Sequence, residues 1–225
     1  MPLALFAALA AAAAAGVRPA FDGPIMRFAG RHGGGWVDAL MRAISTLGGA
    51  RVLAPLALAC VLALFWRRRP ASALLLTLAS LGAALNPPLK ELFHLPRPHV
   101  FPPRVTESGY GFPSGHAMTS MAIVGGLCAV AWRTRARWRW PALALGGLFV
   151  LAVGASRVEL GVHSPSDVLA GWAFSLAWVV GAAVFVSCLE RRREQARGRA
   201  EPGPAGAGRS APGGRSSRGR AGGVR

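Results

Sequence analysis

Three groups of residues, spaced along the middle of the chain, have the side chains needed to bind and cleave a phosphate ester. The groups are Lys90 with Arg97 and Pro98; Pro113, Ser114, Gly115 and His116; and Ser156, Arg157, His163 and Asp167. Lys90 is the only lysine among 26 basic residues, and the others are arginines. Because an ammonium and a guanidinium differ in geometry and hydration, this single exception indicates a selected ligand.

Phosphate chemistry explains why cations dominate these groups. A phosphate monoester spreads up to two negative charges over three oxygens, so its cleavage depends mainly on positioning and on charge compensation by fixed donors. Lys90, Arg97 and Arg157 are the predicted clamp. A guanidinium holds two oxygens at once, whereas the ammonium acts as a point charge.

Two predicted helix starts add backbone donors to this clamp. Ser114 is a predicted N-cap, and the free N–H groups that follow it form an anion site. Gly115 lets the backbone approach an oxygen closely. Ser164 and the proline after it begin a second helix, so His163 precedes that helix and Asp167 lies in its first turn.

The histidines supply the chemistry. His163 and Asp167 are four residues apart, so the carboxylate can hold one ring nitrogen while the other attacks phosphorus. His116 would protonate the departing oxygen and then activate the water that releases phosphate from His163. Each group alone could be an interfacial cation or a helix cap, but their order and shared face favour a site. His32, His94 and His99 lack such partners and are predicted to be surface or packing residues.

The elements that position these residues are predicted to be membrane helices, because 52% of the chain is hydrophobic and the apolar residues form long runs. A membrane-spanning helix needs about 17 to 25 residues. The runs are roughly 3–17, 52–66, 71–90, 116–132, 140–156 and 166–189. The predicted fold class is therefore an all-α, polytopic membrane helix bundle of about six transmembrane helices.

Charge distribution predicts the orientation of the bundle. The net charge of +17 would suit a nucleic-acid partner, but the charges lie between and after the apolar runs, so no nucleic acid is expected. Seventeen basic residues fall in one set of alternate loops and tails, and nine fall in the other. The richer side is assigned to the cytoplasm, together with both termini. All three groups then face the periplasm or cell exterior. Inserting a charged residue at bilayer depth costs about 2.5 to 3.5 kcal/mol, so a cluster of ionic residues at one membrane face indicates a function.

Three parts are expected along the chain. Residues 1–51 form a first transmembrane helix and an outer segment, 52–190 the catalytic bundle, and 191–225 a disordered, Arg/Gly/Pro-rich cytoplasmic tail. The tail could contact anionic lipid or serve only as a topology anchor. The first run could instead be a cleaved signal-like segment. Residues 36–47 have the spacing of an amphipathic helix that lies at the outer interface or packs on the bundle.

Two smaller features complete the pattern. The run Asn86, Pro87 and Pro88 is expected to kink the third apolar helix just before Lys90. Cys60, Cys128 and Cys188 fall inside apolar runs without paired spacing, so neither a disulfide framework nor a cysteine metal site is indicated. No acidic cluster with hard-cation spacing lies near the three groups, and no metal or cofactor is expected.

The spacing of the three groups resembles the signature of the type 2 phosphatidic acid phosphatase and vanadium haloperoxidase superfamily, over roughly residues 50–185. The resemblance implies a helical membrane core and metal-independent phosphatase chemistry. His163 would be the nucleophile that forms a phosphohistidine, His116 the acid, and Asp167 the residue that orients His163. The phosphate-binding residues would be Lys90, Arg97, Ser114, Gly115, Ser156 and Arg157.

The predicted function is a membrane lipid phosphatase that removes phosphate from a lipid monophosphate or diphosphate. Undecaprenyl diphosphate and phosphatidic acid are the leading candidate substrates, with phosphatidylglycerol phosphate behind them. Three alternatives stay open. The same residues would serve a phosphotransferase that passes phosphate to a hydroxyl; the resemblance also permits a haloperoxidase; and the cations alone would serve a non-catalytic lipid-phosphate binding or transport protein.

Overall fold

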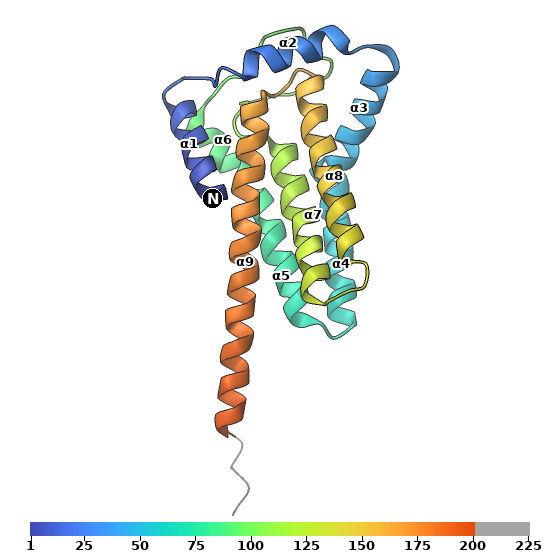
Figure 1. The fold of residues 1–225 in the computed structure, drawn as a ribbon, viewed down its shortest axis with the longest axis vertical. Coiled ribbons are helices and arrows are strands. Elements are labelled where there is room, and N and C mark those ends of the chain that lie inside the picture. The colour runs from blue at the N-terminus through green and yellow to red at the C-terminus, as the bar shows by residue number, and fades with distance from the viewer. Residues whose placement is uncertain (201–225) are drawn as a thin grey trace, which may run out of the picture. The chain divides into compact units, whose positions relative to one another are not determined.

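Apolar helices that run alongside one another form the core of the chain (Figure 1). The computed structural model describes residues 1–200, and these contain no β-strand. Four helical segments are long and apolar enough to cross a membrane: Pro70–Phe93, Gly115–Arg133, Arg139–Glu159 and Pro165–Arg197. A further pair, Gly35–Gly48 and Ala50–Trp66, is bent by 40° and could form a fifth crossing. The predicted all-α membrane helix bundle is confirmed, with four or five spans in place of about six.

Helix α7 (Gly115–Arg133) is the centre of the bundle. It packs against α8 (Arg139–Glu159), α5 (Pro70–Leu81) and α4 (Ala50–Trp66). Small residues allow these close contacts, because a Cβ added at Gly126 would lie 2.8 Å from the Cβ of Ala79. Small residues are the usual solution in a bilayer, where helices associate by close packing without a hydrophobic driving force.

The third span is broken before it reaches the site. Helix α5 ends at Leu81, a 3-10 segment η1 covers Gly82–Leu85, and α6 covers Asn86–Phe93. Pro87 lacks an N–H donor, and it sits in the first turn of α6, where no intrahelical donor is required. The change of helix type therefore falls at the predicted kink, and it sets the direction of α6, whose last turn carries Lys90.

The N-terminal segment differs most from expectation. Helix α1 (Pro2–Ala14) has 13 residues, about 20 Å at 1.5 Å per residue, which is short for a hydrocarbon core of about 30 Å. The expected first transmembrane helix is thus too short to cross by itself. It packs instead on aromatic residues of the bundle: the ring centroids of Phe6 and Phe174 lie 5.1 Å apart in edge-to-face geometry. Helix α2 (Asp22–His32), which the sequence did not predict, crosses the ends of α8 and α9 (Figure 1).

Helix α3 (Gly35–Gly48) covers the predicted amphipathic segment and packs along α8. A Cβ at Gly48 would lie 2.5 Å from Val153, so the two helices approach as closely as a glycine permits. Of the two expected arrangements of this helix, packing on the bundle is therefore favoured over lying at the outer membrane interface. The bend between α3 and α4 occurs at Gly49, and this bend faces the site described below.

Helix α9 (Pro165–Ala200) continues past the predicted bundle boundary at residue 190. The residues after Glu190 are mostly arginine, glutamate, glutamine and alanine, all good helix formers, so the helix need not end where the apolar run ends. One compact unit comprises Met1–Glu190. The remainder of the expected disordered tail, 201–225, and its possible lipid contact lie outside the described residues.

Candidate active site

The three sequence groups meet at one end of the bundle. Lys90 lies in α6, Arg97 in the 94–114 connection, Ser114 to His116 at the start of α7, Arg157 at the end of α8, and His163 and Asp167 around the start of α9. These helix ends lie on the same side in Figure 1. Within the connection the N–H of Gly111 donates to the Leu95 carbonyl at 2.7 Å, and the N–H of Arg104 donates to the Leu160 carbonyl at 3.0 Å, which ties the connection to the end of α8.

His163 and Asp167 form a buried pair. The backbone N–H of Ser164 donates to Oδ2 of Asp167 at 2.8 Å, which fixes the carboxylate within the first turn of α9. Nδ1 of His163 lies 3.7 Å from the same oxygen. That separation exceeds a hydrogen bond, although catalytic hydrogen bonds often tighten only once substrate is bound. Both residues have 2% exposure or less.

Arg97 determines which nitrogen of His163 is free to react. Its Nη1 lies 3.3 Å from Nε2 of His163 and donates to the Val162 carbonyl at 3.0 Å. Arginine only donates hydrogen bonds, so Nε2 must be the unprotonated acceptor and Nδ1 must carry the hydrogen that faces Asp167. This tautomer is assigned from the donor, since hydrogens are not located directly. Burial lowers the pKa of His163 to about 4, although Asp167 acts in the opposite direction. The ring is therefore neutral at pH 7, with its lone pair on Nε2.

Arg157 is almost completely buried and is held from two directions. Its Nη1 donates to the hydroxyl of Ser45 on α3, and its Nη2 donates to Glu107, each at 2.5 Å. Its Nε has no partner among the described residues. A buried guanidinium with an unused donor is costly unless an anion satisfies it. Arg157 is therefore well suited to receive a phosphate oxygen.

Glu107 is an acidic residue of this cation cluster that no sequence motif indicated. Its Oε1 contacts Arg157, and its Oε2 lies 3.6 Å from Nη2 of Arg97, so it bridges the two guanidinium groups. Burial alone would raise the pKa of Glu107, but Arg157 and Arg97 outweigh burial and lower it. The available signal was the buried arginine itself, because Glu107 is the only acidic residue of the 94–114 connection.

Lys90 reaches toward the same connection. Its Nζ donates to the carbonyl of Tyr110 at 2.5 Å, and its side chain is only partly buried. An ammonium has three donors, so this contact leaves two for an anion. The three cations predicted to form a clamp, Lys90, Arg97 and Arg157, thus lie at one end of the bundle, with Glu107 as a counter-charge to the two arginines.

The start of α7 has the expected form. Ser114 is its N-cap, and the Ser114 hydroxyl is buried without a hydrogen-bond partner among the described residues. A Cβ at Gly115 would lie 2.8 Å from Oδ1 of Asn86, so this position has no room for a side chain. The Asn86 amide is itself tied to the Pro113 carbonyl at 3.1 Å. An orphan hydroxyl and open backbone N–H groups make this helix start a suitable anion site.

His116 faces a polar cavity of about 670 Å³ that it shares with Arg157 and Glu107. The opposite wall comes from α3 and α4, and includes Arg42 and Arg51, two cations that no sequence motif indicated. The α3–α4 bend touches His116 directly, because a Cβ at Gly49 would lie 3.3 Å from Nε2 of His116. The cavity volume falls in the range of small-molecule sites, so it can hold a whole headgroup.

Ser156 does not present its hydroxyl to this cluster. It is fully buried, and its Oγ donates to the Val153 carbonyl of its own helix at 2.6 Å. Its hydrogen is thus already used inside α8, unlike the free hydroxyl of Ser114. His32, His94 and His99 are exposed, as predicted for histidines outside the site.

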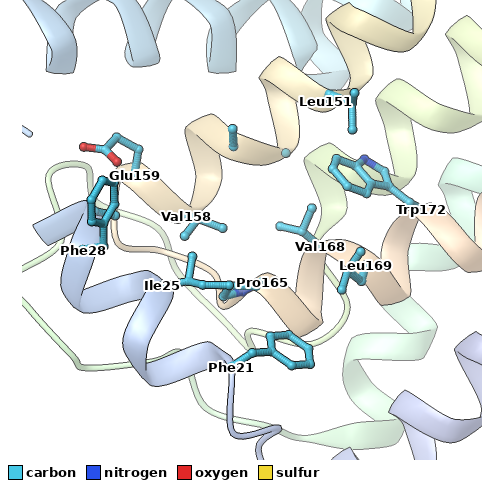
Figure 2. A pocket seen from close by; sticks show the side chains of 13 residues that line it. Phe21, Ile25, Phe28, Leu151, Val158, Glu159, Pro165, Val168, Leu169 and Trp172 are labelled. Atoms are coloured by element: carbon cyan, nitrogen blue, oxygen red, sulfur yellow. The ribbon is translucent and has the colours of Figure 1, made fainter. Parts of the chain in front are cut away.

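Two cavities beside the site are almost entirely apolar. One, of about 520 Å³, lies between α2, α8 and α9, where Phe21, Ile25 and Phe28 face Leu169 and Trp172 (Figure 2). It contains none of the clamp residues. The other, of about 390 Å³, lies between α4, α5 and α7 and shares Ala50 with the polar cavity. Both walls are mainly hydrocarbon, with Glu159 in the first and the hydroxyls of Thr77, Ser80 and Thr119 in the second, so both suit a hydrocarbon ligand. Among residues 1–200, no three His, Cys, Asp or Glu side chains gather as metal ligands would.

Comparisons with known proteins agree with this geometry. The family model described as the PAP2 superfamily matches residues 70–193. The chain is 32% identical over 145 residues to phosphatidylglycerophosphatase B of Bacillus subtilis, covering 63% of this chain and 71% of that protein. It is 36% identical over 81 residues to an undecaprenyl-diphosphatase of Sulfolobus acidocaldarius, covering 36% of this chain and 34% of that protein. The crystal structure of a PAP2 type phosphatidylglycerolphosphate phosphatase from Bacillus subtilis superposes with a TM-score of 0.69 at 27% identity, covering 85% of this chain and 96% of that one.

Proposed function

Because this chain belongs to the PAP2 superfamily of membrane phosphatases, we propose that it hydrolyses a lipid phosphate or diphosphate through a phosphohistidine intermediate. The observation that carries the proposal is the pairing of a neutral, buried His163 with Asp167 on one side and the Arg97 guanidinium, 3.3 Å away, on the other. A nucleophile beside its orienting carboxylate and an anion-binding cation is the arrangement that phosphoryl transfer requires.

The reaction takes two displacements. In the first, Nε2 of His163 forms a bond to phosphorus as the bond from phosphorus to the lipid oxygen breaks, and His116 gives its proton to that oxygen. In the second, His116 removes a proton from water, the water oxygen attacks phosphorus, and the nitrogen–phosphorus bond breaks. Asp167 stabilises the positive charge that the His163 ring gains in the first step.

The remaining residues compensate charge. Lys90, Arg97 and Arg157 bind the phosphate oxygens, and the Ser114 hydroxyl and the backbone at Gly115 add neutral donors. Substrate displaces Glu107 from the two guanidinium groups as it enters. Ser156 contributes indirectly, by fixing the last turn of α8 next to Arg157. We propose that no metal is used, because three cations already supply the positive charge.

Lipid is the proposed substrate class because the polar cavity and the apolar cavity of about 390 Å³ share the wall at Ala50. A headgroup in the first places its hydrocarbon tail in the second. Phosphatidylglycerol phosphate and undecaprenyl diphosphate are supported by the names of the relatives, and phosphatidic acid carries the same phosphate and tail. The chain would dephosphorylate one or more of these.

We further propose that the site faces the periplasm or cell exterior of the inner or cell membrane. Arg67 to Arg69 and the arginines of 133–139 lie in the loops at the opposite end of the helices from the site, which the positive-inside rule assigns to the cytoplasm. The end of α9 is then cytoplasmic. A cytoplasmic N-terminus would require α1 to cross, and its 13 residues are short for that.

Phosphate release by the detergent-purified protein tests this function. The substrates are phosphatidylglycerol phosphate, undecaprenyl diphosphate and phosphatidic acid, with His163→Ala as the blank and His32→Ala, an exposed histidine outside the site, as the matched control. We expect release by the wild type and by His32→Ala only. Transfer of the phosphate to an added alcohol without free phosphate would identify a phosphotransferase. Binding without turnover of any substrate would overturn the enzyme proposal.

A further inference from the structure

One oxygen of the buried Asp167 carboxylate is not accounted for by the site. Oδ2 receives the Ser164 N–H and faces His163, but Oδ1 has no hydrogen-bond partner among the described residues. A fully buried carboxylate with a free oxygen is unfavourable unless a cation lies nearby. The nearest cation is Nη1 of Arg18, at 3.6 Å from Oδ1.

Arg18 comes from the connection between α1 and α2, outside the residues 70–193 that the family model matches. Its guanidinium also donates to the Ser164 hydroxyl at 3.0 Å and to the Pro96 carbonyl at 2.7 Å. Ser164 follows His163, and Pro96 precedes Arg97. The Arg18 side chain therefore links the segment that carries His163 to the segment that carries Arg97.

The same connection is anchored to α9 by a second contact. Asp22 is 3% exposed and accepts hydrogen bonds from the backbone N–H of Ser166 at 2.9 Å and from its hydroxyl at 2.5 Å. A carboxylate on the first N–H groups of a helix is favourable for the helix. Asp22 thus fixes the chain four residues after Arg18, which limits where the Arg18 guanidinium can lie.

We infer that Arg18 is a positioning residue for the reaction: its guanidinium holds Oδ1 of Asp167, so that Oδ2 stays aligned on Nδ1 of His163 while the nucleophile attacks. This inference rests on the proposed function. The polar contacts of the Arg18 guanidinium among the described residues are with Ser164, Pro96 and Asp167, and not with His163. Arg18 acts through Asp167, and its loss should change the rate of the chemical step more than the binding of substrate.

The test compares kcat and KM for phosphate release by the full-length wild type, Arg18→Ala and Arg18→Lys. We expect Arg18→Ala to lower kcat roughly 10- to 100-fold, the usual effect of losing one charged hydrogen-bonding partner, with KM within about threefold. Arg18→Lys keeps the charge but not the fork that reaches Ser164 and Pro96, and should recover part of kcat. Because the Arg18 side chain is 30% exposed, millimolar guanidinium chloride should restore part of the activity of Arg18→Ala.

Two controls separate positioning from folding. Arg31→Ala removes an exposed cation of the same N-terminal segment and should leave kcat unchanged. Asp22→Asn weakens the anchor to Ser166 without touching Asp167. It should lower the thermal midpoint and leave kcat within a few-fold of the wild type. Equal kcat for Arg18→Ala and wild type would overturn the inference while leaving the phosphatase function intact. So would a loss that neither lysine nor guanidinium recovers. Failure of the wild type to release phosphate would instead sink the proposed function.

Discussion

Replacing Asp167 with asparagine tests how the site activates its nucleophile. The substitution keeps the size of the side chain and leaves one oxygen to accept the Ser164 N–H. It removes the charge that faces Nδ1 of His163 at 3.7 Å. Because the position of Oδ2 receives the Ser164 N–H, the amide oxygen is expected there and the amide nitrogen at the position of Oδ1, so the substitution removes the charge without placing a second donor against the ring N–H.

The expected size follows from the same distance. Two unit charges 3.7 Å apart interact by about 4 to 5 kcal/mol at an effective dielectric constant of about 20. The ring of His163 becomes positively charged only as the nitrogen–phosphorus bond forms, so this energy is realised in the transition state and not in substrate binding. At about 1.4 kcal/mol for each tenfold change, the loss corresponds to a fall in kcat of about 10³-fold.

The assay is steady-state phosphate release in detergent, with kcat and KM measured separately for Asp167→Asn. Asp22→Asn is the matched control, because Asp22 is also a buried aspartate but contacts Ser166 and not His163. We expect the control to stay within a few-fold of wild-type kcat. A kcat for Asp167→Asn within tenfold of the wild type would refute the view that this carboxylate stabilises the charged ring.

Three further predictions follow from other contacts. The folded-state pKa of His163, about 4, lies below its ordinary value of 6.5, so the unfolded chain binds a proton first as the pH falls. The free energy of unfolding of the wild type, relative to that of His163→Gln, should therefore fall by about 3 kcal/mol between pH 7 and 4. A difference in thermal midpoint between the two proteins that does not change with pH would contradict this. Gly115→Ala, whose Cβ would meet Asn86 at 2.8 Å, should cost about 1 to 3 kcal/mol of stability and lower kcat, because the methyl group keeps phosphate away from the backbone. Adding Asn86→Ala should restore the midpoint but not the rate; recovery of both would show that phosphate does not need the space beside Gly115. Arg51 lies on the wall of the polar cavity opposite His116, where it can contact the second phosphate of a diphosphate substrate. Arg51→Ala should therefore raise KM for farnesyl diphosphate up to about fivefold and leave KM for farnesyl phosphate unchanged. Equal effects on both substrates would exclude this contact.

Local signals made most of this architecture predictable. Apolar runs identified the spans from residue 50 onward, because each buries or exposes to lipid a continuous apolar surface. Fixed spacing identified His163 and Asp167, since residues four apart across a helix start lie close together whatever the rest of the chain does. The clamp residues were predictable in type because phosphate demands cations.

The N-terminal segment was less predictable. The apolar run from residue 3 was expected to reach 17, but the helix ends at Ala14 and Gly16 takes a left-handed φ of 69°, which glycine adopts at little cost. Helix α2 contains two glycines and a proline within 11 residues, which weakens the helix signal, although its buried residues Asp22, Met26 and Ala29 recur at helical spacing. It is held instead by tertiary contacts, through the fully buried Met26 and through Asp22.

The partners of the site arginines could not be read from the sequence. Ser45 and Arg157 are 112 positions apart, and Arg18 and Ser164 are 146 apart. A single polar residue in a connection carries no periodicity, so only the folded chain brings Glu107 to Arg157 or Arg18 to Asp167. These contacts are nevertheless the ones that satisfy buried charges, and they follow from that requirement once the fold is known.

The stereochemical course at phosphorus tests the central claim most directly, because it does not require an intermediate to accumulate. A lipid phosphate made chiral with oxygen isotopes would be turned over in the presence of an acceptor alcohol, and the configuration of the transferred phosphate would be determined. Attack by His163 followed by attack on phosphohistidine inverts the phosphorus twice, so overall retention is predicted. Overall inversion would mean a single direct displacement and would contradict a nucleophilic role for His163.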